Sequence, residues 1–123
     1  MRMNYKSILG ELKKACSGVS TTIYTSSRPA ATDGIKDFVV CSIPITIRDR
    51  GAYGETACRF TLYAKDLNGV ENYTRLAEMQ EKLYGNLPIN NTACAIWEPV
   101  VIPGGSDGSG FHFLHIQANL IIY

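Results

Sequence analysis

Several features that would indicate a familiar function are missing from this 123-residue chain. It has no basic excess for binding nucleic acid, because twelve lysines and arginines are matched by eleven acidic residues. Its longest apolar runs fall far short of the roughly twenty residues that cross a membrane. The N-terminal stretch MRMNYKSILGELKK carries charges within its apolar pattern, unlike a signal peptide. We therefore expect no specific nucleic-acid binding, no membrane insertion and a cytosolic start.

Close cysteine pairs are also missing, although the chain has four cysteines. None of Cys16, Cys41, Cys58 and Cys94 lies at the C-x₂₋₄-C spacing of a zinc knuckle or a redox dithiol. Each has apolar neighbours in the sequence, which predicts a small side chain buried in the core. Disulfides remain an alternative, but nothing in the sequence indicates export.

Motifs for catalysis or phosphate binding are absent as well. No G-x-S-x-G motif occurs, and the serines lie in stretches such as TSSRP and GGSDGSG, where turn formation accounts for them. The glycine-rich stretch lacks the Lys and Ser/Thr of a phosphate-binding loop, and a predicted strand follows it instead of a helix. We therefore expect no enzyme, no catalytic residue and no cofactor.

The two histidines, His112 and His115, stand three residues apart in the closing stretch FHFLHIQANLIIY. On a helix this spacing would place both side chains on one face, where they would suit a metal ion. The even positions from 114 to 122 are all apolar, however, which predicts a strand with one buried face. His112 then lies on the buried face and His115 on the other, so we expect no metal site.

Hydrophobic periodicity predicts two helices. Apolar residues recur at three- and four-residue spacing near the N-terminus, and Gly18 is the expected end of that helix. A second helix is expected within residues 67–88, with Asn68 and Asn72 as competing N-caps. Its predicted buried stripe consists of Tyr73, Leu76, Ala77, Gln80, Leu83, Tyr84 and Leu87.

Five strands are expected, at residues 19–27, 37–50, 56–66, 92–102 and 111–123. Residues 19–27 are rich in β-branched side chains, and a two-residue period marks 37–50, 56–66 and 111–123. In the segment 37–50, alternation places one set of apolar side chains on the core face: Val39, Cys41, Ile43, Ile45 and Ile47. Pro44 interrupts the same segment and indicates an edge or a bulge. The element order is α-β-β-β-α-β-β. It predicts one α+β domain over residues 1–123, with a mainly antiparallel sheet packed against two helices.

Two long loops interrupt this pattern, at residues 28–36 and 103–110. Loops of this length often carry function. Their polar side chains are the candidate partner contacts: Arg28, Asp33, Lys36, Ser106 and Asp107.

The element order and the residue patterns of three stretches resemble those of phage tail terminator and tail-completion proteins. IYTSSRPAATDGIKDFVVCSIPITI resembles the strand, proline-containing loop and strand of that family. CRFTLYAKDLNGVENYTRLAEMQEKL resembles its amphipathic strand, short turn and helix, and FHFLHIQANLIIY resembles its closing strand. The resemblance extends over nearly the whole chain. It assigns a functional role to no individual residue, because it does not rest on an invariant motif.

The resemblance implies a structural subunit that forms a homo-oligomeric ring, typically a hexamer, on the tail tube. Its expected partners are copies of itself, the tail tube protein and the head–tail connector. The expected location is the virion tail, after assembly in the host cytoplasm. A head-closure or minor tail subunit and a tube-like relative remain open. So does a small ligand-binding or regulatory domain, whose pocket would use Arg59, Gln80, Trp97 and His112.

Overall fold

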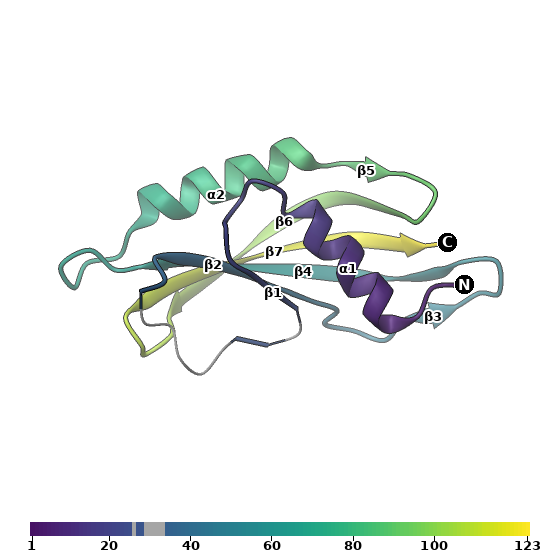
Figure 1. The fold of residues 1–123 in the computed structure, drawn as a ribbon, viewed down its shortest axis with the longest axis horizontal. Coiled ribbons are helices and arrows are strands. Elements are labelled where there is room, and N and C mark those ends of the chain that lie inside the picture. The colour runs from purple at the N-terminus through teal and green to yellow at the C-terminus, as the bar shows by residue number, and fades with distance from the viewer. Residues whose placement is uncertain (26, 29–33) are drawn as a thin grey trace.

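The computed structural model describes residues 1–25, 27–28 and 34–123 and has two helices and a seven-stranded sheet (Figure 1). The candidate residue Asp33 lies outside the described residues. The elements are α1 (Tyr5–Ala15), β1 (Ile23–Thr25), β2 (Asp37–Ser42), β3 (Arg48–Asp49), β4 (Gly54–Lys65), α2 (Tyr73–Asn86), β5 (Ile89–Asn90), β6 (Cys94–Ser106) and β7 (Phe111–Ile122). The predicted α+β class and element order are confirmed, with the two-residue strands β3 and β5 as additions.

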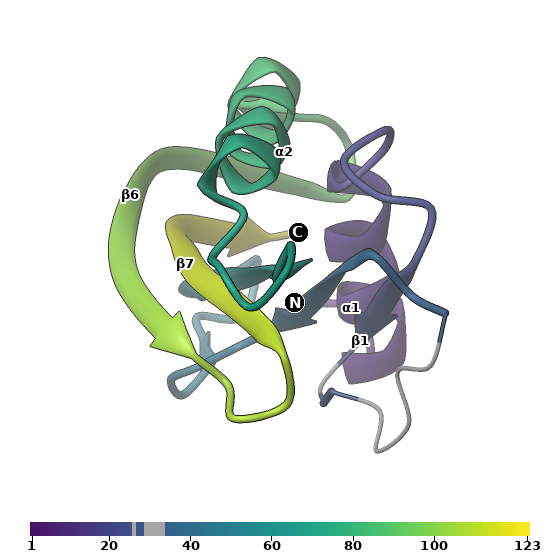
Figure 2. The same cartoon turned by 90° about the vertical axis from the view of Figure 1, so that its left-hand side faces the viewer.

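The sheet has the order β1-β2-β4-β7-β6-β5, and β3 pairs with β4. β1 runs parallel to β2, and the other pairs are antiparallel. The longest unbroken pairing joins β4 to β7, from Gly54 opposite Ile122 to Lys65 opposite Phe111. The sheet is strongly curled, and β6 follows a wide arc when the molecule is seen end-on (Figure 2).

Both helices pack on the same face of this sheet, where one apolar core joins them to the strands. Alternation along the two central strands accounts for this core, because side chains two residues apart point to the same side. The predicted core faces of β4 and β7 are confirmed from Cys58 to Ala64 and from Ile116 to Ile122. All four cysteines are buried on this side, and the sulfur atoms of Cys16 and Cys41 lie 3.6 Å apart. Among the described residues, no helix is long and apolar enough to cross a membrane.

The buried face of α2 differs from the predicted stripe. Its buried residues are Leu76, Met79 and Leu83, whereas Ala77 is exposed and Tyr73 is 59% exposed. Ala77 is rotated by about 100° from Leu76 around the helix, which turns it away from the sheet. Met79 lies one turn after Leu76 and takes the core position instead.

Asn72 is the N-cap of α2, because its side chain accepts a hydrogen bond from the Arg75 N–H at 3.2 Å. The alternative cap, Asn68, belongs instead to the turn between β4 and α2. Its φ of 53° is typical of a tight turn, whereas an N-cap residue typically has an extended backbone.

The segment predicted as one strand over residues 37–50 is broken in the middle. β2 ends at Ser42, and pairing resumes only at Arg48. Pro44 has no N–H for the ladder, so the chain leaves the sheet here. As a result Ile45 does not reach the predicted core face and is 57% exposed.

The predicted loop at residues 103–110 is shorter than expected, because β6 continues to Ser106. The strand passes two register shifts, one of them between Pro103 and Ser106. Gly104 allows this continuation, since a Cβ at that position would collide with the backbone oxygen of Phe113. The true turn between β6 and β7 contains only Asp107 to Gly110.

We expect the end of β7 to be essential for stability, because Ile122 is fully buried in the core that joins the helices to the sheet. Replacing Ile122 with Ala should lower the free energy of unfolding by about 2–5 kcal/mol through lost burial and a cavity. Urea denaturation measures this change. The matched control is Ile121→Ala on the opposite face, where the side chain is only partly buried. Equal losses in the two variants would contradict the assigned faces.

Candidate functional site

No helix in the described part of the chain covers the second face of the sheet, which we call the open face. Residues directly opposite each other on β4 and β7 share a face. This rule places Arg59 and Gln117, Thr61 and His115, and Tyr63 and Phe113 together on the open face. Trp97 of β6 joins them beside Asn119 of β7.

An aromatic cluster occupies one end of the open face. Phe38 stacks on Tyr63, with ring centroids 4.3 Å apart, and meets Phe111 edge-on at 5.3 Å. Phe38 and Phe111 are almost completely buried, although they lie on the face without helices. The guanidinium of Arg28 lies 5.6–5.7 Å from the centres of all three rings. A cation over aromatic faces at this distance is favourable, so Arg28 stabilises the aromatic cluster.

Arg28 also forms an ion pair with Asp107 in the turn between β6 and β7. Nη1 of Arg28 lies 2.6 Å from Oδ2 of Asp107, whose side chain is only 6% exposed. This oxygen and Nε of Arg28 have no hydrogen-bond partner among the described residues, so the contact is an ion pair without a hydrogen bond. Oδ1 of Asp107 accepts hydrogen bonds from the N–H groups of Ser109 and Phe111. Asp107 therefore organises its own turn and connects it to the distant segment that carries Arg28.

The structure thus brings together two of the five candidate contact residues, Arg28 and Asp107. Ser106 lies beside Asp107, and its hydroxyl accepts the N–H of Gly108, which makes it part of the same turn. Lys36 lies apart from them. Together with Lys65 it lines a separate cavity near the start of α2.

Hydrogen-bonded polar pairs form the middle of the open face. Arg59 donates to Oε1 of Gln117 from Nη2 at 2.8 Å and from Nε at 3.2 Å. The hydroxyl of Thr61 lies 2.8 Å from Nδ1 of His115. Burial lowers the pKa of His115 below its ordinary value, and the nearby positive charge of Arg59 adds to this effect. Each pair joins β4 to β7, so the polar side chains satisfy one another without a covering layer.

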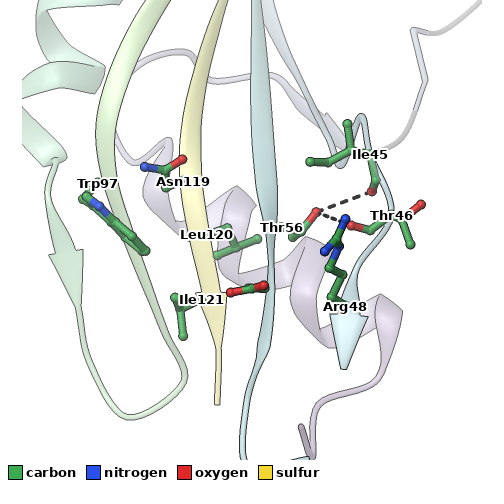
Figure 3. Close-up of a pocket in the computed structure, with 9 residues that line it drawn as sticks. Ile45, Thr46, Arg48, Thr56, Trp97, Asn119, Leu120 and Ile121 are labelled. Carbon is green, nitrogen blue, oxygen red and sulfur yellow. Dashed lines mark hydrogen bonds between the residues drawn. The ribbon is translucent and has the colours of Figure 1, made fainter. Parts of the chain in front are cut away.

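A hollow of about 360 Å³ lies at the other end of the open face. Figure 3 shows Trp97 on one side of it and Ile45, Thr46 and Arg48 on the other, with the ends of β7 and β4 between them. The Thr56 hydroxyl donates to the backbone oxygen of Thr46 at 3.0 Å and holds the segment after β2 in place. We call this feature the Trp97 hollow.

No match to this chain is found among models of known protein families or among curated proteins. Inferences about function therefore rest on the open face, the edges of the sheet and the two ends of the molecule.

The four polar residues of the expected ligand pocket do not converge. Arg59 and Trp97 lie on the open face, whereas Gln80 is on α2 on the other side of the sheet. Nδ1 of His112 lies 2.7 Å from Oδ1 of Asp66, a contact between β7 and the segment after β4. Strand alternation separates His112 from Arg59, and Gln80 is separated because α2 packs on the other face of the sheet.

The two histidines lie on opposite faces, as the two-residue period predicts. Among the described residues, no three side chains of His, Cys, Asp or Glu are grouped to hold a metal ion. Cys58 and Cys94 are poor nucleophiles at neutral pH, because burial raises the pKa of Cys58 to about 12 and also raises that of Cys94.

Sequence reasoning missed the aromatic cluster and the Trp97 hollow. A signal for the cluster was present, because Phe38, Tyr63, Phe111 and Phe113 all occupy positions assigned to the non-core side of their strands. Aromatic residues on a nominally solvated face indicate a second apolar contact. For the hollow, Pro44 indicated an interruption of the strand, but no local pattern showed that Trp97 of β6 would lie opposite the segment that leaves the sheet there.

We expect the Arg28–Asp107 pair to be energetically coupled. Asp107→Asn keeps an amide oxygen for the turn but removes the charge opposite Arg28, and should cost about 1–3 kcal/mol of unfolding free energy. Urea denaturation of Asp107→Asn, Arg28→Met and the double variant gives the coupling directly. The double variant should lose less than the sum of the two single losses, and simple additivity would contradict the pairing.

His115 should titrate below the ordinary histidine pKa of about 6.5. The unfolded chain then binds more protons than the folded chain below that pH. The stability contribution of neutral His115 is therefore complete above about pH 6.5 and is lost as the pH falls through the lower folded pKa. NMR titration of the imidazole protons measures the pKa of His115. Arg59→Gln should raise it, whereas Lys65→Gln, a control at the far end of β4, should leave it unchanged. An unaltered pKa in Arg59→Gln would contradict the contribution of that charge.

Proposed function

We propose that this chain is a structural subunit of a phage or prophage tail, similar to a tail terminator. In this role copies of the chain form a ring, by resemblance a hexamer, that caps the tail tube and joins it to the head connector. The subunit is not an enzyme, and it acts by presenting surfaces in the virion tail after assembly in the host cytoplasm.

The observation that carries this proposal is the one-sided packing of the sheet. Both helices lie on one face, and the open face keeps half-buried aromatic and polar side chains. Its polar groups are already hydrogen-bonded in pairs, such as Arg59 with Gln117. Covering paired groups costs less free energy than covering unpaired ones, because no donor or acceptor loses its partner. A face of this kind suits a contact with another protein.

The edges of the sheet support association between copies. At one edge, the three residues of β1 have no strand on their outer side within the described ranges. At the other edge, β5 pairs only with Ala95 and Ile96, so the later part of β6 lacks an outer partner among the described residues. Val100 and Val101 on this part are 53% and 42% exposed. Unpaired edges and exposed apolar residues favour association, and a head-to-tail interface closes into a ring when the rotation permits.

The alternative of a small ligand-binding or regulatory domain has less support, because its expected polar groups are divided between two faces. A head-closure or minor tail subunit and a tube-like subunit share the features above, and a genetic experiment separates them from a terminator.

Deletion of the gene from the phage or prophage should produce tails of uncontrolled length that do not join heads. Electron microscopy of particles after induction measures tail length and head attachment, and expression of the intact gene from a plasmid should restore both. Tails of normal length without heads would favour the head-closure role. Tails of normal length with heads attached would contradict the proposal.

A further inference from the structure

The connection from β4 to α2 contains a rigid two-residue turn. Asn68 and Gly69 both have positive φ angles, 53° and 76°, which is the type I′ geometry of tight hairpins. The backbone groups of Leu67 and Val70 exchange two hydrogen bonds, of 2.8 and 3.0 Å. Because these two residues are directly paired, their side chains lie on the same side of the turn.

This turn holds two apolar side chains in solvent at one end of the molecule. Leu67 is 62% exposed and Val70 is 59% exposed. Figure 1 shows the connection projecting beyond the sheet at the end away from the chain termini. Adjacent exposed apolar side chains often mark a contact site, and a preformed turn loses little conformational entropy when it binds. We call Leu67 to Val70 the apolar turn.

The Trp97 hollow lies near the opposite end of the same molecule. Its walls include the exposed side chain of Ile45 together with Trp97 and Ile121, and its volume of about 360 Å³ accommodates a pair of aliphatic side chains. The hollow borders Thr56 near the start of β4, whereas the apolar turn follows the end of that strand. The rise of an extended strand separates them by about 35 Å, so the turn cannot reach the hollow of its own chain.

The unpaired charges beside the two features are opposite. Glu55 lines the Trp97 hollow but is paired with Arg50, and Asp66 precedes the apolar turn but is paired with His112. The exposed Glu71 directly follows the apolar turn, and the exposed Arg48 lines the hollow. Neither side chain forms an ion pair within the described part of the chain. Opposite charges next to matching apolar surfaces favour one orientation of contact over others.

We propose that copies of this chain bind head to tail, with the apolar turn of one copy seated in the Trp97 hollow of the next. Glu71 of the inserted turn then lies near Arg48 at the rim of the hollow. The two surfaces differ, so the interface is heterologous and leaves one free turn and one free hollow after each addition. This inference rests on the proposed function, for which it supplies the contact that joins neighbouring subunits of the ring.

Two substitutions test the two halves of the contact in the purified full chain. Leu67→Asp damages the turn and Ile45→Asp damages the hollow, and both replace exposed side chains, so folding should be preserved. Sedimentation equilibrium over a range of concentrations should show self-association of the wild type. Each variant should weaken the association constant by about tenfold or more, the effect expected for burying a charge in place of an aliphatic side chain. The control Tyr5→Asp alters a residue of α1 that is 52% exposed and should associate like the wild type.

Mixing the two variants tests the head-to-tail arrangement itself. The Leu67→Asp chain keeps an intact hollow, and the Ile45→Asp chain keeps an intact turn. An equal mixture should therefore form a one-to-one dimer that does not grow further, at a concentration where each variant alone associates much more weakly than the wild type. A symmetric contact that used only one of the two surfaces would give no such complementation and would overturn the inference.

Charge reversal adds a second readout at the rim. Arg48→Glu should weaken association, and the double variant Arg48→Glu with Glu71→Arg should recover it.

A wild type that stays monomeric at millimolar concentration, or variants that associate like the wild type, would overturn this contact. Those results would leave the proposed function standing if gene deletion still gave tails of uncontrolled length. Normal tails after deletion would instead refute the function, whatever the purified chain does.

Discussion

The pairing of β4 with β7 is the constraint on which the rest of the structure depends. Twelve consecutive residue pairs hold these strands in one register, from Gly54 opposite Ile122 to Lys65 opposite Phe111. Because side chains alternate along a strand, a slip of one residue would exchange the two faces of β7. The same register places Phe60 and Ile116 in the core and joins Arg59 to Gln117 on the open face.

The two faces are stabilised in different ways. The helix side is an apolar core in which the helices and strands bury their side chains together. The open face combines an aromatic cluster under Arg28 with hydrogen-bonded polar pairs and an apolar hollow. The polar pairs in its middle are already hydrogen-bonded in the single chain, and the face still offers apolar surface to another protein. This combination suits a subunit that folds before it assembles.

The ends of β4 carry the two surfaces of the proposed contact between copies. Asn68 and Gly69 form a tight turn beyond β4, and its hydrogen bonds hold Leu67 and Val70 in solvent. At the opposite end, Pro44 releases the chain from the sheet, which exposes Ile45 and creates one wall of the Trp97 hollow. Both features arise from local backbone chemistry, and the length of β4 sets the distance between them.

The sequence by itself determined the helices, the central strands, the opposite faces of the two histidines and the core position of the cysteines, because these depend on local periodicity. Only the tertiary structure decided which segments meet. The contact between Arg28 and Asp107 and the division of the expected pocket residues between two faces follow from strand order and register. The continuation of β6 through Gly104 likewise depends on its close approach to β7. These features are set by pairings between residues far apart in the chain. A local sequence pattern does not show which of these pairings has the lowest free energy.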